Sequence, residues 1–216
     1  MPSFRGHVET LELWRRFPAL ETVDGVGDAV ALTFDDGPDP DCTPAVLDAL
    51  DATGAKATFF MVGEQLMRHH ALAREVAERG HELALHGFEH RDHGTLSPQQ
   101  ARDDLARGLG TLEAGAGRKP RWFRPPYGRF SEASYEACEK LGLERVYWSA
   151  WGMDWEPLPA DRIAETVVRD LRAGDIVLLH DSPRYAPREN ALPTAEAVPL
   201  IAESGMRLTT LSELAG

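Results

Sequence analysis

From residue 29 onward, short apolar runs alternate with longer mixed stretches that are bounded by Ser, Pro or Gly. The short runs predict strands, at residues 29–34, 57–62, 82–85, 121–124, 145–149, 175–179 and 207–210. The longer stretches predict helices, at residues 44–50, 64–79, 98–115, 131–141, 160–171 and 193–203. This alternation indicates an α/β fold with a parallel sheet and helical crossovers. Seven such units in this length favour a closed or nearly closed (β/α)7 barrel, TIM-barrel-like and in a single domain.

Residues 1–28 precede the alternation, and we expect them to form an N-terminal extension to a domain of residues 29–216. Residues 9–20 show some helical spacing of apolar side chains, which we expect to cover part of the domain. The start of the chain lacks the charged, apolar and small-residue regions of a secretory signal. No apolar run approaches the roughly 18 residues that a transmembrane helix needs. The sequence as given therefore predicts a cytoplasmic protein.

Composition narrows the range of partners. The 216 residues carry a formal net charge of −12 and are 43% hydrophobic. Nucleic acids and anionic membrane surfaces both require patches of Lys and Arg, so the acidic balance argues against either partner. The two cysteines, Cys42 and Cys138, do not form a disulfide framework. No obligate protein partner is indicated.

The most informative stretch is the end of the first predicted strand. There a buried run meets two adjacent carboxylates, Asp35 and Asp36, and then the turn residues Gly37 and Pro38. Successive side chains at a strand end point in different directions, so the two acids can serve different tasks. Taken alone, the stretch is equally typical of a solvated turn, because Asp, Gly and Pro all favour turns.

Other strand ends carry titratable or polar residues as well, and in barrels of this kind the site lies at the carboxyl ends of the strands. These residues fall at 86–90, at 124–127, at 154–155 after a short loop, and at 180. His86 and His90 are four residues apart, a spacing that can bring both imidazoles to one ion. With Asp36 they make a two-His, one-Asp set that leaves an open position for catalysis. The alternatives are solvated histidines, or His93 as a competing ligand; we prefer His86 and His90 because His86 directly ends a strand.

Five ordered motifs resemble those of the polysaccharide deacetylase family, a group of carbohydrate esterases that includes chitin and peptidoglycan deacetylases. They are TFDDG at 33–37, HGFEH at 86–90, RPPYG at 124–128, DW at 154–155 and IVLLHD at 176–181. The resemblance extends from about residue 29 to the C-terminus. It implies a distorted (β/α) barrel, a catalytic domain at residues 29–216, a divalent metal and removal of acetyl groups from N-acetylated sugars. The metal is usually zinc in this family, and the ligand set also accepts cobalt, nickel or manganese.

The resemblance assigns the metal to Asp36, His86 and His90, and the role of general base to Asp35. It implies that Arg124 orients Asp35; a purely structural salt bridge is the alternative. The backbone N–H of Tyr127 would stabilise the oxyanion.

His180 would be the general acid, with a satisfied core histidine as the alternative. Trp155 and Leu178 would line the acetyl pocket, although core packing explains both nearly as well. Trp151 could stack on a sugar face, and so could Trp148, for which core packing is simpler.

Two positions depart from the family pattern. The second motif usually has Ser or Thr after its first histidine, where this chain has Gly87, so another group would have to brace the metal loop. The fourth motif usually opens with an Asp three residues before the DW pair, where this chain has Trp151. That carboxylate helps to set the pKa of the histidine acid in the family. Asp154 and Asp181 are the candidates to replace it.

The main functional hypothesis is a metal-dependent hydrolase that deacetylates N-acetylglucosamine-type oligo- or polysaccharide. One variant keeps the chemistry but acts on an O-acetyl sugar or a non-sugar amide. The absence of an export signal weakly favours a small intracellular substrate. A hypothesis of another class is a catalytically degenerate glycan-binding domain, which the departures at Gly87 and Trp151 favour. Retention of both the base and the acid argues against it. Specificity is expected in the loops at 90–97, 151–159 and 181–193.

Overall fold

The computed structural model describes residues 8–117 and 119–216, so the first seven residues of the predicted extension lie outside the described part. Seven strands form one curled sheet in the order β5-β4-β3-β2-β1-β7-β6, and β8 pairs with β1. All of these pairs are parallel. The bounds are β1 (Ala29–Asp35), β2 (Thr58–Met61), β3 (Glu82–Leu85), β4 (Trp122–Phe123), β5 (Glu144–Arg145), β6 (Ala150–Trp151), β7 (Ile176–His180) and β8 (Arg207–Thr209).

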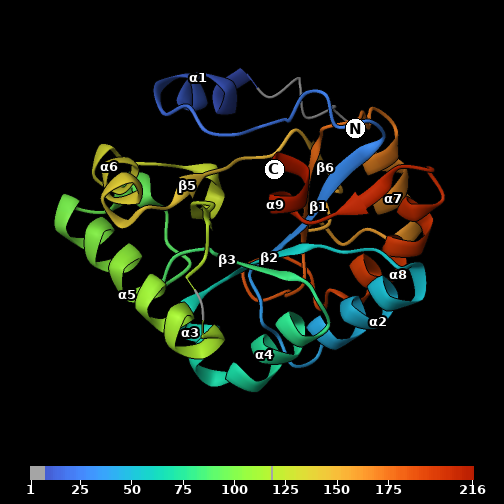
Figure 1. The fold of residues 1–216 in the computed structure, drawn as a ribbon, viewed down its shortest axis with the longest axis horizontal. Coiled ribbons are helices and arrows are strands. Elements are labelled where there is room, and N and C mark those ends of the chain that lie inside the picture. Colours follow the sequence, from blue (N-terminus) through green and yellow to red (C-terminus); the bar gives the residue numbers. More distant parts are fainter. Residues whose placement is uncertain (1–7, 118) are drawn as a thin grey trace.

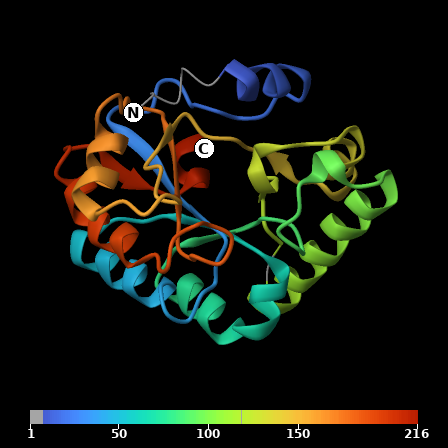
Figure 2. The ribbon, with the colours of Figure 1, turned by 180° about the vertical axis from the view of Figure 1, so that it is seen from behind.

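Helices cover the outer side of this sheet. Figure 1 shows α5, α3, α4, α2 and α8 in an arc around it, with α1 on the opposite side, and Figure 2 shows the same arrangement from behind. The described helices are α1 (Val8–Arg16), α2 (Thr43–Thr53), α3 (Gly63–Arg68), α4 (His70–Glu78), α5 (Pro98–Ala116), α6 (Glu132–Leu141), α7 (Ala160–Val168), α8 (Leu192–Ala202) and α9 (Leu211–Ala215). Across residues 8–117 and 119–216, every helix is too short or too polar to cross a membrane. The predicted distorted α/β barrel in a single domain is confirmed.

The strand predicted at residues 145–149 is wrong. The stretch contains the end of β5, and β6 begins only after it, at the opposite edge of the sheet. Between them the Tyr147 N–H donates to the Leu20 carbonyl, and the Ser149 N–H donates to the Ile176 carbonyl. The apolar run therefore crosses from one edge of the sheet to the other, and an apolar run alone does not reveal its pairing partner.

The helix predicted at 64–79 is two helices. His69 lies between α3 and α4 with φ −129° and ψ 39°, which are not helical angles. The sequence there has neither Pro nor Gly to mark the break. The amphipathic pattern continues through it, because Leu66, Ala73 and Val76 are all buried on the same core.

Residues 20–23 bridge the edge of the curled sheet at β5 to the amino end of β7, which lies between β1 and β6. Leu20 forms a bridge with Val146, next to β5, and Thr22 forms a bridge with Asp175, next to β7. Before them, Trp14 is buried; its ring stacks on Tyr147 at 4.0 Å, and its Nε1 donates to the Gly128 carbonyl at 3.0 Å. We call residues 20–23 the seam segment. The domain boundary at residue 28 stays a prediction.

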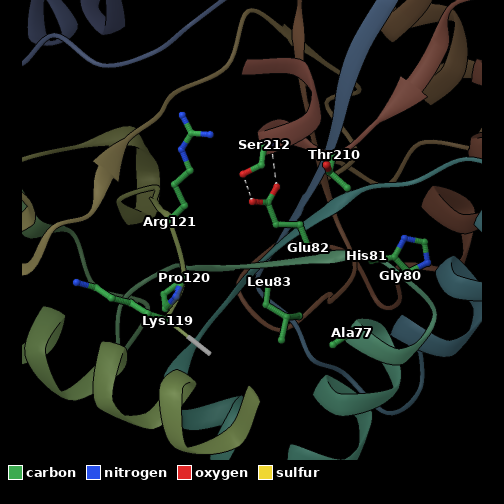
Figure 3. A pocket seen from close by; sticks show the side chains of 10 residues that line it. All are labelled: Ala77, Gly80, His81, Glu82, Leu83, Lys119, Pro120, Arg121, Thr210 and Ser212. Atoms are coloured by element: carbon green, nitrogen blue, oxygen red, sulfur yellow. Dashed lines mark hydrogen bonds between the residues drawn. The ribbon is translucent and has the colours of Figure 1, made fainter. Parts of the chain in front are cut away.

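The start of β3, the residues before β4 and the residues after β8 line a cavity of about 420 Å³, shown in Figure 3. Glu82, the first residue of β3, lies at its centre. Its carboxylate accepts hydrogen bonds from the Thr58 hydroxyl at 2.7 Å, from the Ser212 N–H at 3.0 Å and from the Ser212 hydroxyl. Both carboxylate oxygens of Glu82 are thus engaged.

Candidate active site

The polar strand ends converge on a cavity of about 800 Å³ at the carboxyl ends of the strands. Asp35 is the last residue of β1 and His180 the last of β7, and the sheet places the two opposite each other. His86 directly follows β3, and Arg124 follows β4. The lining of this cavity includes nine of the ten predicted site residues: Asp35, Asp36, His86, His90, Tyr127, Trp151, Trp155, Leu178 and His180. The tenth, Arg124, is fully buried behind Asp35.

Asp36 turns out of the strand and faces the two histidines. Its φ of 82° is in the left-handed region, which costs a non-glycine residue about 1–3 kcal/mol and is found mainly at functional sites. Its Oδ1 lies 3.2 Å from His90 Nε2 and 3.5 Å from His86 Nε2. Burial opposes the charge on this carboxylate, but His90, His180 and His86 outweigh it and hold the Asp36 pKa below its usual range.

This cluster fits a divalent cation. One ligand atom from each of Asp36, His86 and His90 lies within 4.8 Å of the other two. Asp36 Oδ1 is buried and makes no hydrogen bond with the described residues. Burial lowers the pKa of His86 to about 4, which keeps the imidazole neutral as metal ligation requires. His86 Nδ1 faces the Arg124 carbonyl at 2.8 Å, so its Nε2 is directed to the cluster.

His93, the alternative ligand, faces away from the cluster. Its Nε2 lies 3.3 Å from Asp104 Oδ2. The Asp104 carboxylate also accepts from the Phe88 N–H at 3.0 Å and from the Glu89 N–H at 2.9 Å. A Cβ on Gly87, which has φ 86°, would lie 2.8 Å from the same carboxylate. Asp104 therefore braces the loop that carries His90, where the family pattern would lead us to expect a hydroxyl at position 87.

Asp35 and Arg124 form a buried pair. Arg124 Nη1 donates to Asp35 Oδ1 at 2.8 Å and to the Thr33 hydroxyl at 2.8 Å, while Nη2 donates to the Tyr147 carbonyl at 2.9 Å. Asp35 Oδ2 lies 3.7 Å from His86 Nε2. The guanidinium thus fixes one carboxylate oxygen and leaves the other toward the cavity.

His180 pairs with Asp154 and not with Asp181. Its Nδ1 lies 2.9 Å from Asp154 Oδ1, and its backbone N–H donates to Asp154 Oδ2 at 2.8 Å. Burial would lower the His180 pKa, but the charge and hydrogen bond of Asp154, with Asp36 and Asp35, raise it to about 9.

Asp181 instead accepts from the Thr43 hydroxyl at 2.5 Å, and burial raises its pKa to about 7. The open question at position 151 therefore has a structural answer, because Asp154 supplies the carboxylate.

Aromatic rings form much of the remaining cavity wall. Trp155 packs edge-on against His180 at 5.8 Å and against Trp151 at 5.3 Å. Trp151, Trp148 and Leu178 are buried, whereas Tyr127 is 57% exposed and has φ 59°. The Tyr127 ring packs edge-on against His90 at 4.7 Å.

Four residues beside the site were not predicted from the sequence: Gln65, Asp104, Tyr185 and Arg188. Asp104 had a detectable signal, because it shares the buried face of its helix with Ala101, Leu105 and Gly108. The other three had none. Arg188 and Tyr185 lie in the irregular segment between β7 and α8, and Gln65 lies on the short helix α3.

Comparisons with known proteins identify the family of this chain. The family model described as "Polysaccharide deacetylase" matches residues 23–146. A peptidoglycan-N-acetylglucosamine deacetylase of Bacillus cereus is 36% identical over 188 residues, which are 86% of this chain and 87% of the relative. A chitooligosaccharide deacetylase of Bradyrhizobium is 38% identical over 162 residues, covering 74% of this chain and 73% of the relative.

Solved structures share the fold. The Bc1960 peptidoglycan N-acetylglucosamine deacetylase superposes with a TM-score of 0.84 at 28% identity, covering 93% of this chain and 94% of that one. A family 4 acetyl xylan esterase from Clostridium thermocellum, in complex with a cobalt ion, gives 0.78 at 34% identity over 86% and 89% of the two chains. A family 4 pseudoenzyme from Bacillus anthracis gives 0.81 at 26% identity over 92% and 69%. On these matches, the chain belongs to the polysaccharide deacetylase family.

Proposed function

We propose that this protein is a metal-dependent hydrolase that removes acetyl groups from N-acetylglucosamine units of an oligo- or polysaccharide. The observation that carries the proposal is the arrangement around one cavity: a cation cluster, a carboxylate held by Arg124 and a histidine held by Asp154. The family membership and the activities for which the relatives are named support the same function.

Asp36, His86 and His90 would hold the metal, with zinc the first choice and cobalt, nickel or manganese as alternatives. The ion would supply Lewis-acid polarisation of the acetamide carbonyl and would lower the pKa of water. A cobalt ion is present in the structure of the acetyl xylan esterase, which supports a divalent metal in this family.

Asp35 would act as the general base. Its Oδ1 is engaged by Arg124, so Oδ2 is the atom that would accept a proton from the attacking water. Arg124 would hold the carboxylate in position through the whole reaction, because the guanidinium is itself fixed by Thr33 and the Tyr147 carbonyl.

His180 would act as the general acid. Its Nδ1 faces Asp154, so a proton on Nε2 is the one available to the leaving amine. A raised pKa keeps this imidazole protonated at neutral pH, as the role of acid requires.

The remaining contacts would position the acetyl group and the sugar. The backbone N–H of Tyr127 would donate to the oxyanion that forms on the carbonyl. Trp155 and Leu178 would exclude water around the acetyl methyl, and Trp151 would extend that apolar wall.

The test is acetate release from short N-acetylglucosamine oligomers by zinc-loaded protein, beside a chelated sample. We expect release that disappears with chelation and returns when zinc is added back. Protein that demonstrably holds zinc and releases no acetate from any oligomer would contradict the proposal.

Two neighbours define the competing outcomes. Acetylated xylan tested in parallel would reveal O-deacetylation, the activity named for the acetyl xylan esterase. Saturable oligomer binding without turnover would place this chain with the pseudoenzyme. Asp35→Asn separates these cases, because it removes the base and should leave simple glycan binding intact.

A further inference from the structure

The two histidines of the cation cluster are held in different ways. Metal-ligating histidines almost always donate their second ring N–H to a carbonyl, a carboxylate or water, which fixes the ring. His86 follows this rule through the Arg124 carbonyl at 2.8 Å. His90 Nδ1 is buried and has no hydrogen-bond partner among residues 8–117 and 119–216. Within this part of the chain, the contacts that can orient the His90 imidazole are those of neighbouring rings.

One of these rings is that of Tyr185. It stacks on the His90 imidazole with centroids 4.2 Å apart and planes 8° from parallel. The Tyr127 ring also touches His90, but edge-on, at 66°. A parallel ring restricts rotation of the imidazole about its long axis, because any rotation would drive one edge of the imidazole into the stacked face.

Tyr185 is itself held from a second direction. Gln65 Nε2 donates to the Tyr185 hydroxyl at 3.1 Å, and Gln65 is only 2% exposed on helix α3. The hydroxyl is thus tied to a buried group on the opposite side from the irregular segment that carries the ring.

The segment is also anchored just beyond Tyr185. Arg188 is buried and donates from Nη2 to the His180 and Ser182 carbonyls, each at 3.1 Å. Its Nη1 donates to the Thr194 hydroxyl at 2.7 Å and to the Asp154 carbonyl. The irregular segment that carries Tyr185 is therefore fixed to the rest of the protein and is not a free loop.

We propose that Tyr185 is a positioning residue for the metal centre, whose stacked ring orients His90 in place of the missing hydrogen bond. This inference rests on the proposed function only in that Asp36, His86 and His90 bind a divalent metal. The stacking acts on metal affinity, and the Gln65 hydrogen bond only places the ring.

The experiment measures the dissociation constant of Zn²⁺ by competition with a chromophoric chelator, for wild type, Tyr185→Ala, Tyr185→Leu and Tyr185→Phe. Loss of an outer-shell partner of a ligating histidine typically weakens metal binding about 10- to 100-fold. We expect about a tenfold loss in Tyr185→Ala and Tyr185→Leu. Tyr185→Phe keeps the stacked ring and should stay within about threefold of wild type. Leu192→Ala changes an exposed residue just after the same irregular segment. This variant is the matched control and should bind Zn²⁺ like wild type.

A second readout separates positioning from a general structural role. The visible absorption of the Co²⁺-loaded protein reports coordination geometry, and it should change in Tyr185→Leu but not in Tyr185→Phe. Thermal unfolding of the metal-free variants should differ little from wild type. If Tyr185→Ala does not fold, the comparison of Tyr185→Leu with Tyr185→Phe tests the positioning role.

Equal Zn²⁺ affinity and equal Co²⁺ spectra in Tyr185→Leu, Tyr185→Phe and wild type would overturn the inference. The proposed function would still stand. Wild-type protein that binds no Zn²⁺ would overturn the metal site itself, and with it both proposals.

Discussion

Each end of the parallel sheet holds a carboxylate among polar groups, Glu82 at the amino end and Asp36 at the carboxyl end, and the described residues satisfy the two to different degrees. At the amino end, the Glu82 carboxylate accepts hydrogen bonds from Thr58 and Ser212. Figure 3 shows those from Ser212. At the carboxyl end, Asp36 Oδ1 and His90 Nδ1 have no hydrogen-bond partner among the described residues. Buried polar groups that satisfy one another stabilise a fold, whereas unsatisfied ones indicate a site built for something else to bind.

Backbone strain follows the same division, and His180 and His81, one from each end, have pKa values shifted in opposite directions. The three non-glycine residues with positive φ in the described chain, Asp36, Tyr127 and Met153, lie in or next to the carboxyl-end site. His180 at that end has its pKa raised to about 9 by Asp154, against the opposing effect of burial. His81 at the amino end has its pKa lowered to about 4, by burial first and then by Lys56 and Arg79. One histidine is kept charged and the other neutral, so substitutions at the two ends should affect different properties.

The largest effect we expect is from Asp35→Asn at the carboxyl end. The amide cannot accept a proton, so kcat for acetate release should fall about 10³-fold, within the range measured for loss of a general base. Zinc affinity should change less than about threefold, because the three ligands are intact. Steady-state kinetics and chelator competition on the same preparation measure both. A rate within tenfold of wild type would remove Asp35 from the role of base.

Next is Glu82→Ala at the amino end, which should cost stability and spare activity. The change leaves the Ser212 N–H and hydroxyl without their acceptor, and we expect the free energy of unfolding to fall by about 2–3 kcal/mol. Urea denaturation gives this value, and kcat/KM at low temperature should stay within about twofold. A large loss of activity in folded protein would mean that the two ends are coupled.

A smaller effect should follow from Asp154→Asn, which removes the charge that keeps His180 protonated. In wild type the acid form is present below the raised pKa, so the rate should decline as pH rises through about 9. In the variant this decline should begin at a lower pH, and the rate at neutral pH should fall about 10- to 100-fold. The pH profile of kcat is the measurement. An unchanged alkaline limb would assign it to another group.

The smallest effect concerns stability in acid and depends on His81. The folded protein holds this imidazole neutral down to about pH 4, while the unfolded chain binds a proton near pH 6.5. The contribution of His81 to the free energy of unfolding is therefore complete above about pH 6.5 and is lost as the pH falls toward 4. About 2 kcal/mol of it is lost by pH 5. His81→Asn keeps an acceptor for the Ala57 N–H and should flatten this part of the curve. The urea midpoints of wild type and His81→Asn at pH 5 and pH 7.5 measure this difference.

The barrel and the convergence of the site were predictable from the sequence for one physical reason. Parallel strands joined by helical crossovers bring their carboxyl ends to one edge, so acids and histidines placed there must meet. This argument predicts that Asp35, Asp36, His86 and His180 lie together, and the structure places them around one cavity.

What could not be predicted depends on irregular backbone. Tyr185 and Arg188 lie in a segment with no periodicity, so only tertiary packing brings one onto His90 and the other onto the His180 carbonyl. Likewise, the Val146 N–H donates to the Phe123 carbonyl of β4, whereas the next N–H, of Tyr147, donates to the Leu20 carbonyl of the seam segment, and the apolar pattern cannot distinguish these partners. The sequence does not distinguish Asp154 from Asp181 as the partner of His180, because Asp181 is its neighbour in the chain whereas Asp154, 26 residues away, reaches it only through tertiary packing.

The seam segment also affects the order in which parts of the chain can fold during synthesis. Residues 20–23 leave the ribosome before their partners at Val146 and Asp175, which are made more than a hundred residues later. The seam segment can therefore take its place only after those partners have been synthesised. Until then the faces at Val146 and Asp175 are open, and a nascent chain stalled before residue 175 would expose them to chaperones or to neighbouring chains.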